Sequence, residues 1–181
     1  KSIKIGPPEH PATFMGPVID CQARDRIIEL IDQGTREAEL VYHREVLGGG
    51  FYVGPAIFDQ VPAMSVIATE EIFGPVISVL VAADFESALA MANQTRFGLT
   101  GGVYSRNPEH IDLAKEKLQV GNLYINRGIT GALVRRQPFG GCKFSGVGAK
   151  AGGPDYVKQF MVNKIITENT MRRGFTPFEG D

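Results

Sequence analysis

The spacing of apolar residues along the chain predicts helices that alternate with strands. Residues 20–34 carry an isoleucine- and leucine-rich stripe at helical spacing, with Asp20 in position to cap the helix and Gly34 to end it. Two further helices are predicted over 85–95, after the capping residue Asp84, and over 111–118.

Short apolar runs between these helices predict strands, and the longest is the near-continuous β-branched run 74–83. Such a run is typical of a strand that is covered on both faces. A last helix is expected near 154–161, and 127–151 is expected to be a long loop. The predicted strands are 38–43, 54–61, 74–83, 99–105, 121–126 and 163–168. The alternation favours an α/β fold with an open, mostly parallel twisted sheet and flanking helices.

Composition and charge narrow the classes of partner. The 181 residues include 19 basic and 20 acidic side chains, so nothing in the charge balance indicates nucleic acid or an anionic membrane. No apolar run approaches the roughly 20 residues that span a bilayer. Two cysteines without a pattern favour a reducing compartment, and three scattered histidines predict no metal site.

Two segments carry candidate chemistry. In the segment 69–76, TEEIFGPV, a turn would hold Phe73 at the mouth of a strand two residues after a carboxylate. A ring and a carboxylate so placed could bind a planar ring and sugar hydroxyls, although an exposed acidic turn is the alternative. The loop 127–151 is long enough to be functional, and its glycines let backbone amides converge on an anion beside Phe139. A surface loop rich in turn residues is the alternative there.

Neither cysteine has the surroundings of a nucleophile. A reactive thiolate needs a base, a cation or a helix N-terminus to lower its pKa. Cys142 lies beside Lys143, but sequence neighbours in an extended chain point to opposite sides, and the loop holds no histidine. Cys21 follows the predicted helix cap Asp20, where the helix dipole could help to ionise the thiol, but it has no other partner. Cys142 is therefore expected to be a small, half-buried thiol.

Together these segments resemble the aldehyde dehydrogenase superfamily. EEIFGP at 70–75 and PFGGCKFSG at 138–146 match two of its motifs in the right order and separation, and the resemblance covers residues 4–168. The segments 124–134, YINRGITGALV, and 148–157, GAKAGGPDYV, are similar to the proline-catabolic branch, the pyrroline-5-carboxylate dehydrogenases.

The resemblance implies roles for particular residues. Glu71 would hydrogen-bond the nicotinamide ribose of NAD, and Phe73 would pack near the nicotinamide ring. The amides of Gly131 and Ala132 would hold the carboxylate of glutamate semialdehyde, with Phe139 beside its methylenes. The segment Lys164–Glu168 would extend a sheet across a subunit interface, which implies a homo-oligomer.

The resemblance also implies that the catalytic cysteine lies outside this chain. The family's nucleophile, activating glutamate, oxyanion-hole asparagine and cofactor domain would all precede Lys1, so the chain would contain no catalytic residue. Residues 1–163 would be the C-terminal part of a catalytic domain, and 164–181 an oligomerisation strand with a loose tail. The protein is expected in the cytoplasm, or in the mitochondrial matrix of a eukaryote. A stand-alone binding module without activity and an aldehyde dehydrogenase of another specificity remain alternatives.

Overall fold

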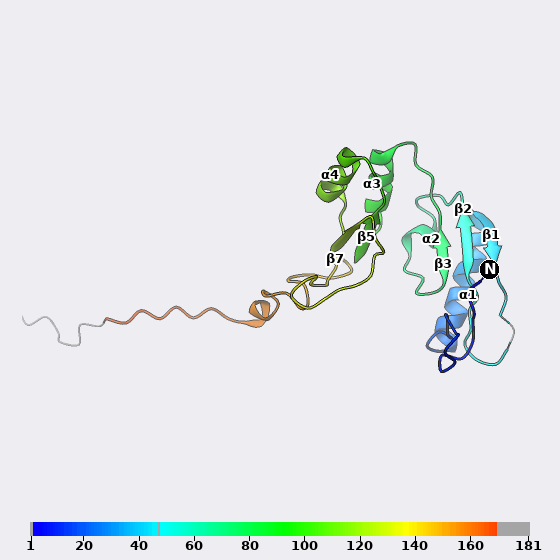
Figure 1. Ribbon diagram of the computed structural model, residues 1–181, viewed down its shortest axis with the longest axis horizontal. Helices are drawn as coiled ribbons and strands as arrows, with labels where there is room; N and C mark the ends of the chain where they lie inside the picture. Colours follow the sequence, from blue (N-terminus) through cyan, green and yellow to red (C-terminus); the bar gives the residue numbers. More distant parts are fainter. Residues whose placement is uncertain (1, 47, 170–181) are drawn as a thin grey trace, which may run out of the picture.

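The computed structural model describes residues 2–46 and 48–169, which form two compact halves followed by a projecting C-terminal segment (Figure 1). The helices are α1 (Cys21–Glu37), α2 (Val66–Thr69), α3 (Phe85–Asn93), α4 (Pro108–Lys117) and the 3-10 helix η1 (Val157–Phe160). The strands are β1 (Glu39–His43), β2 (Ala56–Asp59), β3 (Val76–Ser78), β4 (Phe97–Gly98), β5 (Thr100–Val103), β6 (Asn122–Ile125) and β7 (Cys142–Lys143).

The α/β fold class is confirmed, although the described strands form three small open sheets instead of one. The first sheet has the order β1-β2-β3, in which β1 and β2 are antiparallel and β2 and β3 are parallel. The pair β5–β6 is parallel and the pair β4–β7 is antiparallel. The expected mostly parallel arrangement therefore holds for two of these four pairs.

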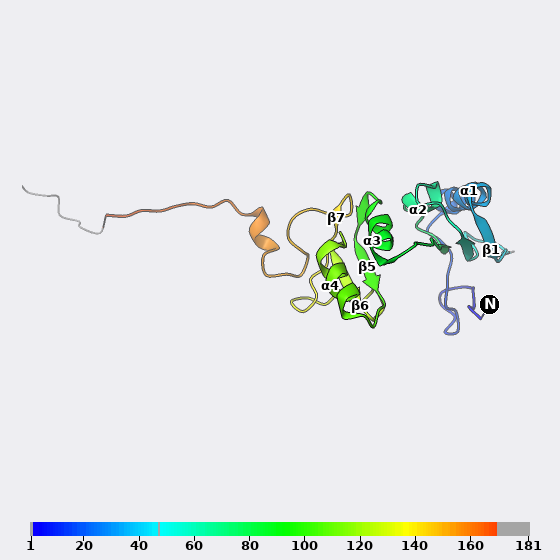
Figure 2. The ribbon, with the colours of Figure 1, turned by 90° about the horizontal axis from the view of Figure 1, so that it is seen from above.

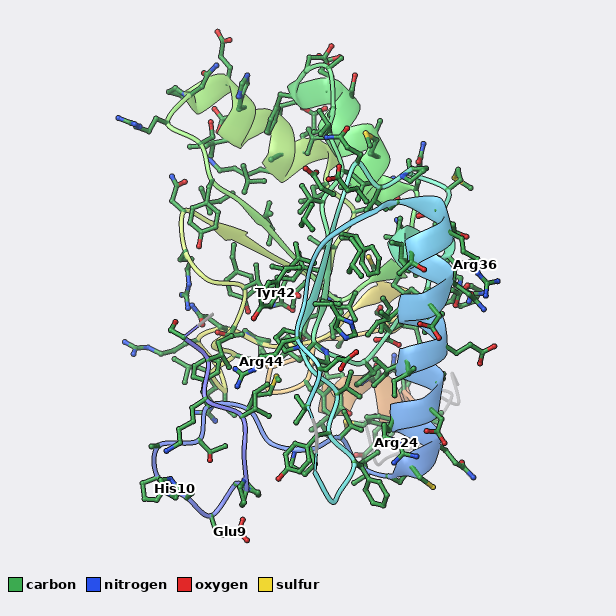
Figure 3. All side chains as sticks on the ribbon, turned by 90° about the vertical axis from the view of Figure 1, so that its right-hand side faces the viewer. Glu9, His10, Arg24, Arg36, Tyr42 and Arg44 are labelled. Atoms are coloured by element: carbon green, nitrogen blue, oxygen red, sulfur yellow. The ribbon has the colours of Figure 1, made fainter. Side chains whose placement is uncertain are left out.

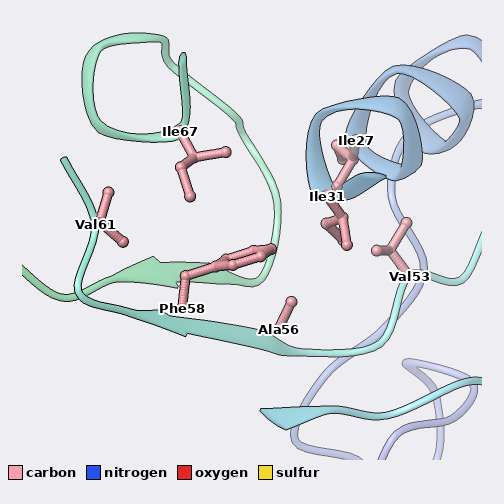
Figure 4. Packing of buried hydrophobic residues seen from close by; sticks show 7 residues of the cluster. All are labelled: Ile27, Ile31, Val53, Ala56, Phe58, Val61 and Ile67. Atoms are coloured by element: carbon pink, nitrogen blue, oxygen red, sulfur yellow. The ribbon is translucent and has the colours of Figure 1, made fainter. Parts of the chain in front are cut away.

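The core of the first half lies between α1, α2 and the sheet β1-β2-β3. Ile27 and Ile31 point from α1 toward Ala56 and Phe58 of β2, and Ile67 of α2 closes the cluster (Figure 4). Asp20 caps α1 as predicted, because its Oδ1 accepts from the Ala23 amide at 2.7 Å. Phe58 is fully buried at the centre of this core.

The prediction that Gly34 ends the first helix was wrong, because α1 continues to Glu37. Gly34 is a buried interior residue of the helix, and a Cβ built on it would lie 2.8 Å from Cζ of Phe58. The missing side chain allows the helix to approach the Phe58 ring closely. Gly34 therefore allows α1 to pack closely against Phe58 and does not end the helix.

The run 74–83 was predicted as a long strand covered on both faces, and both parts of that prediction were wrong. Strand β3 covers only Val76–Ser78, with main-chain hydrogen bonds to the β2 segment continuing one residue to each side, and the side chain of Ile77 is 57% exposed. Ile77 lies on the sheet face opposite α1, where it lines a hollow of 570 Å³ together with Tyr42 and Arg44. In Figure 3, Tyr42 and Arg44 lie away from α1. The described elements thus cover one face of this sheet.

The second half places α3 and α4 against the pair β5–β6 (Figure 2). Asp84 caps α3 as predicted, and hydrogen bonds from the amide and hydroxyl of Ser87 lower the pKa of the Asp84 carboxyl. Phe85 of α3 stacks on His110 of α4, with ring centroids 4.2 Å apart. Leu89 forms the buried contact of α3 with this second core.

The C-terminal predictions were only partly right. A short 3-10 helix replaces the helix expected near 154–161. The segment 163–168 forms no strand within the described part of the chain, and Ile165 is 92% exposed. Pairing of this segment with another subunit therefore stays a prediction. Residues 170–181 of the expected loose tail lie outside the described residues.

Candidate active site

The turn 70–75 presents two predicted cofactor residues on the surface. The side chains of Glu71 and Phe73 are exposed, and Phe73 has a left-handed backbone with φ of +53°. Arg26 of α1 donates to the carbonyl oxygens of Glu71 at 3.4 Å and Ile72 at 2.7 Å. Gly74 packs against the buried Ile27, because a Cβ at Gly74 would lie 2.7 Å from Cγ2 of Ile27. Helix α1 thus supports the inner side of the turn 70–75, while the Phe73 ring and the Glu71 carboxylate face the solvent.

Glu71 lines a hollow of 490 Å³ between the two motifs. The hollow is bordered by the segment 97–102, which runs through β4 and β5, and by Ser145 of the second motif. Ser145 is fixed there because its Oγ accepts from the Gly98 amide at 3.0 Å. The structure therefore brings Glu71 and the end of the glycine-rich loop to one cavity.

The loop 127–151 is ordered by short backbone pairings. Leu133 and Gln137 form a two-way bridge, with hydrogen bonds of 3.0 and 2.7 Å between their main-chain groups. Phe139 and Ala151 form a second bridge, which leaves the Phe139 side chain half-buried. These pairings give a long connection without helices a defined shape.

Gly131 and Ala132 lie on the exposed part of this loop. Within the described residues, neither amide donates a hydrogen bond, so both remain available to an acceptor. Gly131 has φ of +104°, a conformation that only glycine adopts without strain. The Arg127 guanidinium donates to the Thr130 carbonyl at 2.9 Å and brings a positive charge close to these amides. This combination suits a small carboxylate.

The second motif, 138–146, has a structural part in this fold. Lys143 donates through Nζ to the carbonyl oxygens of Asn93 at 2.8 Å and Thr95 at 3.0 Å, at the C-terminal end of α3. The half-buried thiol of Cys142 faces the carbonyl oxygens of Gly98 at 3.5 Å and Gln119 at 3.4 Å. Among the described residues, the Cys142 thiol therefore has two acceptors and no base as hydrogen-bond partners, in agreement with the prediction of a small, half-buried thiol.

The predicted residues gather at two places and not one. Glu71 and Phe73 share the turn 70–75, whereas Gly131, Ala132 and Phe139 lie on the long loop. The hollow that Glu71 lines does not include any of the three loop residues.

Residues that sequence reasoning missed hold these two places. Arg26 supports the first, and Asn122 of β6 supports the second by donating to the Pro138 carbonyl at 2.9 Å and accepting from the Gly140 amide at 3.2 Å. No local sequence pattern indicates either role, because each side chain forms hydrogen bonds with a segment far away in the sequence.

No group of three His, Cys, Asp or Glu side chains among the described residues could hold a metal ion. None of the helices in this part of the chain combines the length and the apolar character needed to cross a membrane.

Comparison with known proteins places this geometry in a family. The sequence profile of the aldehyde dehydrogenase family matches residues 1–166. The chain belongs to the aldehyde dehydrogenase family. Its sequence is 47% identical over 169 residues to the 1-pyrroline-5-carboxylate dehydrogenase of Geobacillus sp. strain WCH70. That alignment covers 93% of this chain and 33% of the relative, so the chain spans about a third of the length of such relatives.

Two solved structures are similar to the chain. A crystal structure of proline utilization A from Bdellovibrio bacteriovorus, inactivated by N-propargylglycine, superposes with a TM-score of 0.91 at 53% identity. The superposed region covers 99% of this chain and 19% of the proline utilization A chain. The 1-pyrroline-5-carboxylate dehydrogenase from Thermus with bound NAD gives a TM-score of 0.81 at 45% identity, over 88% of this chain and 31% of its own.

Proposed function

We propose that this chain is the C-terminal third of an NAD-dependent pyrroline-5-carboxylate dehydrogenase, which oxidises L-glutamate γ-semialdehyde to L-glutamate in proline degradation. The observation that carries the proposal is the 47% identity to a dehydrogenase of that name over 93% of the chain. The exposed turn 70–75 and the free amides of the long loop supply sites that this reaction requires.

The residues present fit NAD at its nicotinamide end. Glu71 offers an exposed carboxylate at the border of a 490 Å³ hollow, and a carboxylate is a strong acceptor for sugar hydroxyls. Phe73 offers a ring that is 77% exposed and free to pack against a planar group. NAD, when bound, accepts the hydride that leaves the aldehyde carbon. The two side chains would fix its ribose and its ring orientation.

The long loop would bind the other end of the substrate. The free amides of Gly131 and Ala132 would donate to the α-carboxylate, with Arg127 adding charge nearby. Phe139 would pack against the methylenes between carboxylate and aldehyde. An aldehyde that lacks the carboxylate would leave these donors unpaired, which disfavours its binding.

The nucleophile would be supplied from outside this chain, because Cys142 faces carbonyl oxygens, and Cys21 is exposed with only the N-terminus of α1 beside it among the described residues. The thiolate would add to the aldehyde carbon, and water would cleave the thioester after hydride departure. Residues outside this chain would also cover the open face of the sheet β1-β2-β3. The 181-residue chain alone is therefore expected to show no turnover of glutamate semialdehyde.

Assembly and location complete the proposal. The exposed segment Lys164–Glu168, which pairs with no strand in the described part of the chain, would add an edge strand to a second subunit. The resulting homo-oligomer would operate in the cytoplasm, or in the mitochondrial matrix of a eukaryote.

Two proline substitutions in the full-length enzyme test the substrate site. Ala132→Pro removes one amide donor and should raise the KM for glutamate semialdehyde about fivefold, which corresponds to roughly 1 kcal/mol for one lost hydrogen bond. Val134→Pro is the matched control. The main-chain amide of Arg136 donates to the Leu133 carbonyl at 3.1 Å, and Arg135 has φ of +65°. Val134 therefore occupies the second position of a type II turn, where proline is favoured.

The KM should stay unchanged in Val134→Pro. An equal KM in the wild-type enzyme, Ala132→Pro and Val134→Pro would refute the assignment of this loop to the substrate. Rates with aldehydes that lack the carboxylate equal to the rate with glutamate semialdehyde would refute it as well.

A further inference from the structure

One ion pair joins the turn 70–75 to the second half of the molecule. Nη2 of Arg96 lies 2.8 and 2.7 Å from the two carboxylate oxygens of Glu70. The guanidinium carbon of Arg96 lies 5.4 Å from the ring centroid of Phe97, so the cation is also held over an aromatic face. Two contacts from different directions fix where this guanidinium lies.

The same residue also contacts the second motif. The Phe144 amide donates to the Arg96 carbonyl oxygen at 3.1 Å. Arg96 therefore binds the turn 70–75 through its side chain and the loop 138–146 through its main chain. The 490 Å³ hollow with Glu71 on one border and Ser145 on another lies between these two segments.

The position of this pair distinguishes it from the other ion pairs of the described residues. The remaining pairs join residues that are one or three positions apart, whereas Arg96 and Glu70 are 26 positions apart. Their side chains are 53% and 44% exposed, so the pair contributes little to global stability. Because Nη2 of Arg96 contacts both carboxylate oxygens, the pair nevertheless restricts where the guanidinium lies relative to Glu70. We therefore expect the ion pair to affect the position of the turn 70–75 more than the free energy of unfolding.

The turn 70–75 needs such a constraint. Phe73 has a left-handed backbone, which is unfavourable for a residue with a side chain and persists only where the surroundings enforce it. Arg26 enforces the turn from α1, in the first half of the molecule. Because the two halves have separate cores, this contact does not fix the turn relative to the second half.

We propose that Arg96 is a positioning residue for cofactor binding: its pairing with Glu70 sets the separation between the turn 70–75 and the loop 138–146. The proposal rests on the proposed function, in which Glu71 and Phe73 bind the nicotinamide end of NAD. When Arg96 is lost, Glu71 keeps its carboxylate but no longer meets the ribose at a fixed place. NAD affinity falls, while the carboxylate site at Gly131 and Ala132 is left intact.

The test uses the full-length enzyme with Arg96→Gln, Glu70→Gln and the double variant. Each is expected to raise the dissociation constant of NAD about fivefold, as measured by calorimetry without substrate, and the double variant no further than either single one. The KM for glutamate semialdehyde stays unchanged. Arg96→Lys, which retains the charge without the planar fork, recovers part of the affinity. Lys115→Gln is the control, because it breaks an exposed ion pair with Asp112 in α4.

A second readout does not depend on NAD. Hydrogen exchange of peptides that cover 70–75 and 143–146 should accelerate in Arg96→Gln and not in Lys115→Gln, with the melting temperature unchanged in both. Additive effects of the two single changes on NAD binding, or unchanged exchange at 70–75, would overturn the positioning role. If the wild-type enzyme instead failed to oxidise glutamate semialdehyde, the proposed function would fall, and the exchange comparison would still decide the role of Arg96.

Discussion

The contact between Gly34 and Phe58 permits a prediction in which two opposing effects are compared. Replacing Gly34 with alanine raises the helix propensity of α1, which should stabilise the protein by about 1 kcal/mol. The new Cβ would lie 2.8 Å from Cζ of Phe58 and 3.0 Å from Cγ2 of Ile67. Ordinary carbon contacts need about 3.5–4.0 Å, so the surroundings must move by roughly 1 Å.

The clash should outweigh the propensity. Phe58 is fully buried on β2 and Ile67 is also buried, so neither side chain has free space to withdraw into. Overpacking of a tight core costs about 1–3 kcal/mol. The net expectation for Gly34→Ala is a destabilisation of about 1 kcal/mol, seen as a lower urea midpoint of the 181-residue chain by circular dichroism.

Two companion variants make this reasoning refutable. Thr35→Ala changes the exposed neighbour in the same helix and should alter the free energy of unfolding by less than about 0.5 kcal/mol. Phe58→Leu shortens the ring side chain, so adding it to Gly34→Ala should relieve the clash and give a favourable coupling energy of about 1 kcal/mol. Stabilisation by Gly34→Ala, or additive effects of the two changes, would show that the contact with Phe58 is not tight.

Two further predictions concern stability in the second half. A Cβ at Gly121 would clash with the Gly140 carbonyl oxygen, so Gly121→Ala should lower the free energy of unfolding by about 2 kcal/mol. Gly128→Ala places its Cβ in open space and should leave the free energy of unfolding unchanged, and thermal unfolding of the two variants compares them. The Ser87 hydrogen bonds lower the pKa of Asp84, so its ionised cap stabilises α3 above the unfolded-state pKa of about 4 and loses this effect as the pH falls through the folded-state pKa. Asp84→Asn, which cannot ionise, should flatten the fall in stability below about pH 5, and an unchanged pH profile would refute this account.

The sequence predicted the elements that depend on local signals. The helices α1 and α3 begin where Asp20 and Asp84 can cap them, and β1, β2 and β6 coincide with short apolar runs. These signals act between residues a few positions apart, so they can be read without knowledge of the fold. The four-residue helix α2 was missed because it is too short for an apolar period to be recognised.

The motifs of the candidate site could be predicted from the sequence, whereas the residues that hold those motifs in place could not. Glu71 and Phe73 were singled out because the segment 69–76 combines a turn with a ring and a carboxylate, and the structure leaves both side chains exposed. Arg26 and Arg96 were not predicted, since they act on residues about 46 and 26 positions away. Contacts between residues so far apart depend on how whole helices and strands pack, so they produce no periodic pattern in the sequence.

The wrong prediction for the run 74–83 is informative about the whole protein. A strand with β-branched residues on both sides is selected for burial on both faces, because alternation would suffice for a strand with one face in water. In this chain α1 and α2 cover one face, while Ile77 lines the open 570 Å³ hollow of the other. The relatives are about three times longer than this chain, so the proposal that residues outside it cover the second face accounts for the sequence pattern and the exposed face together.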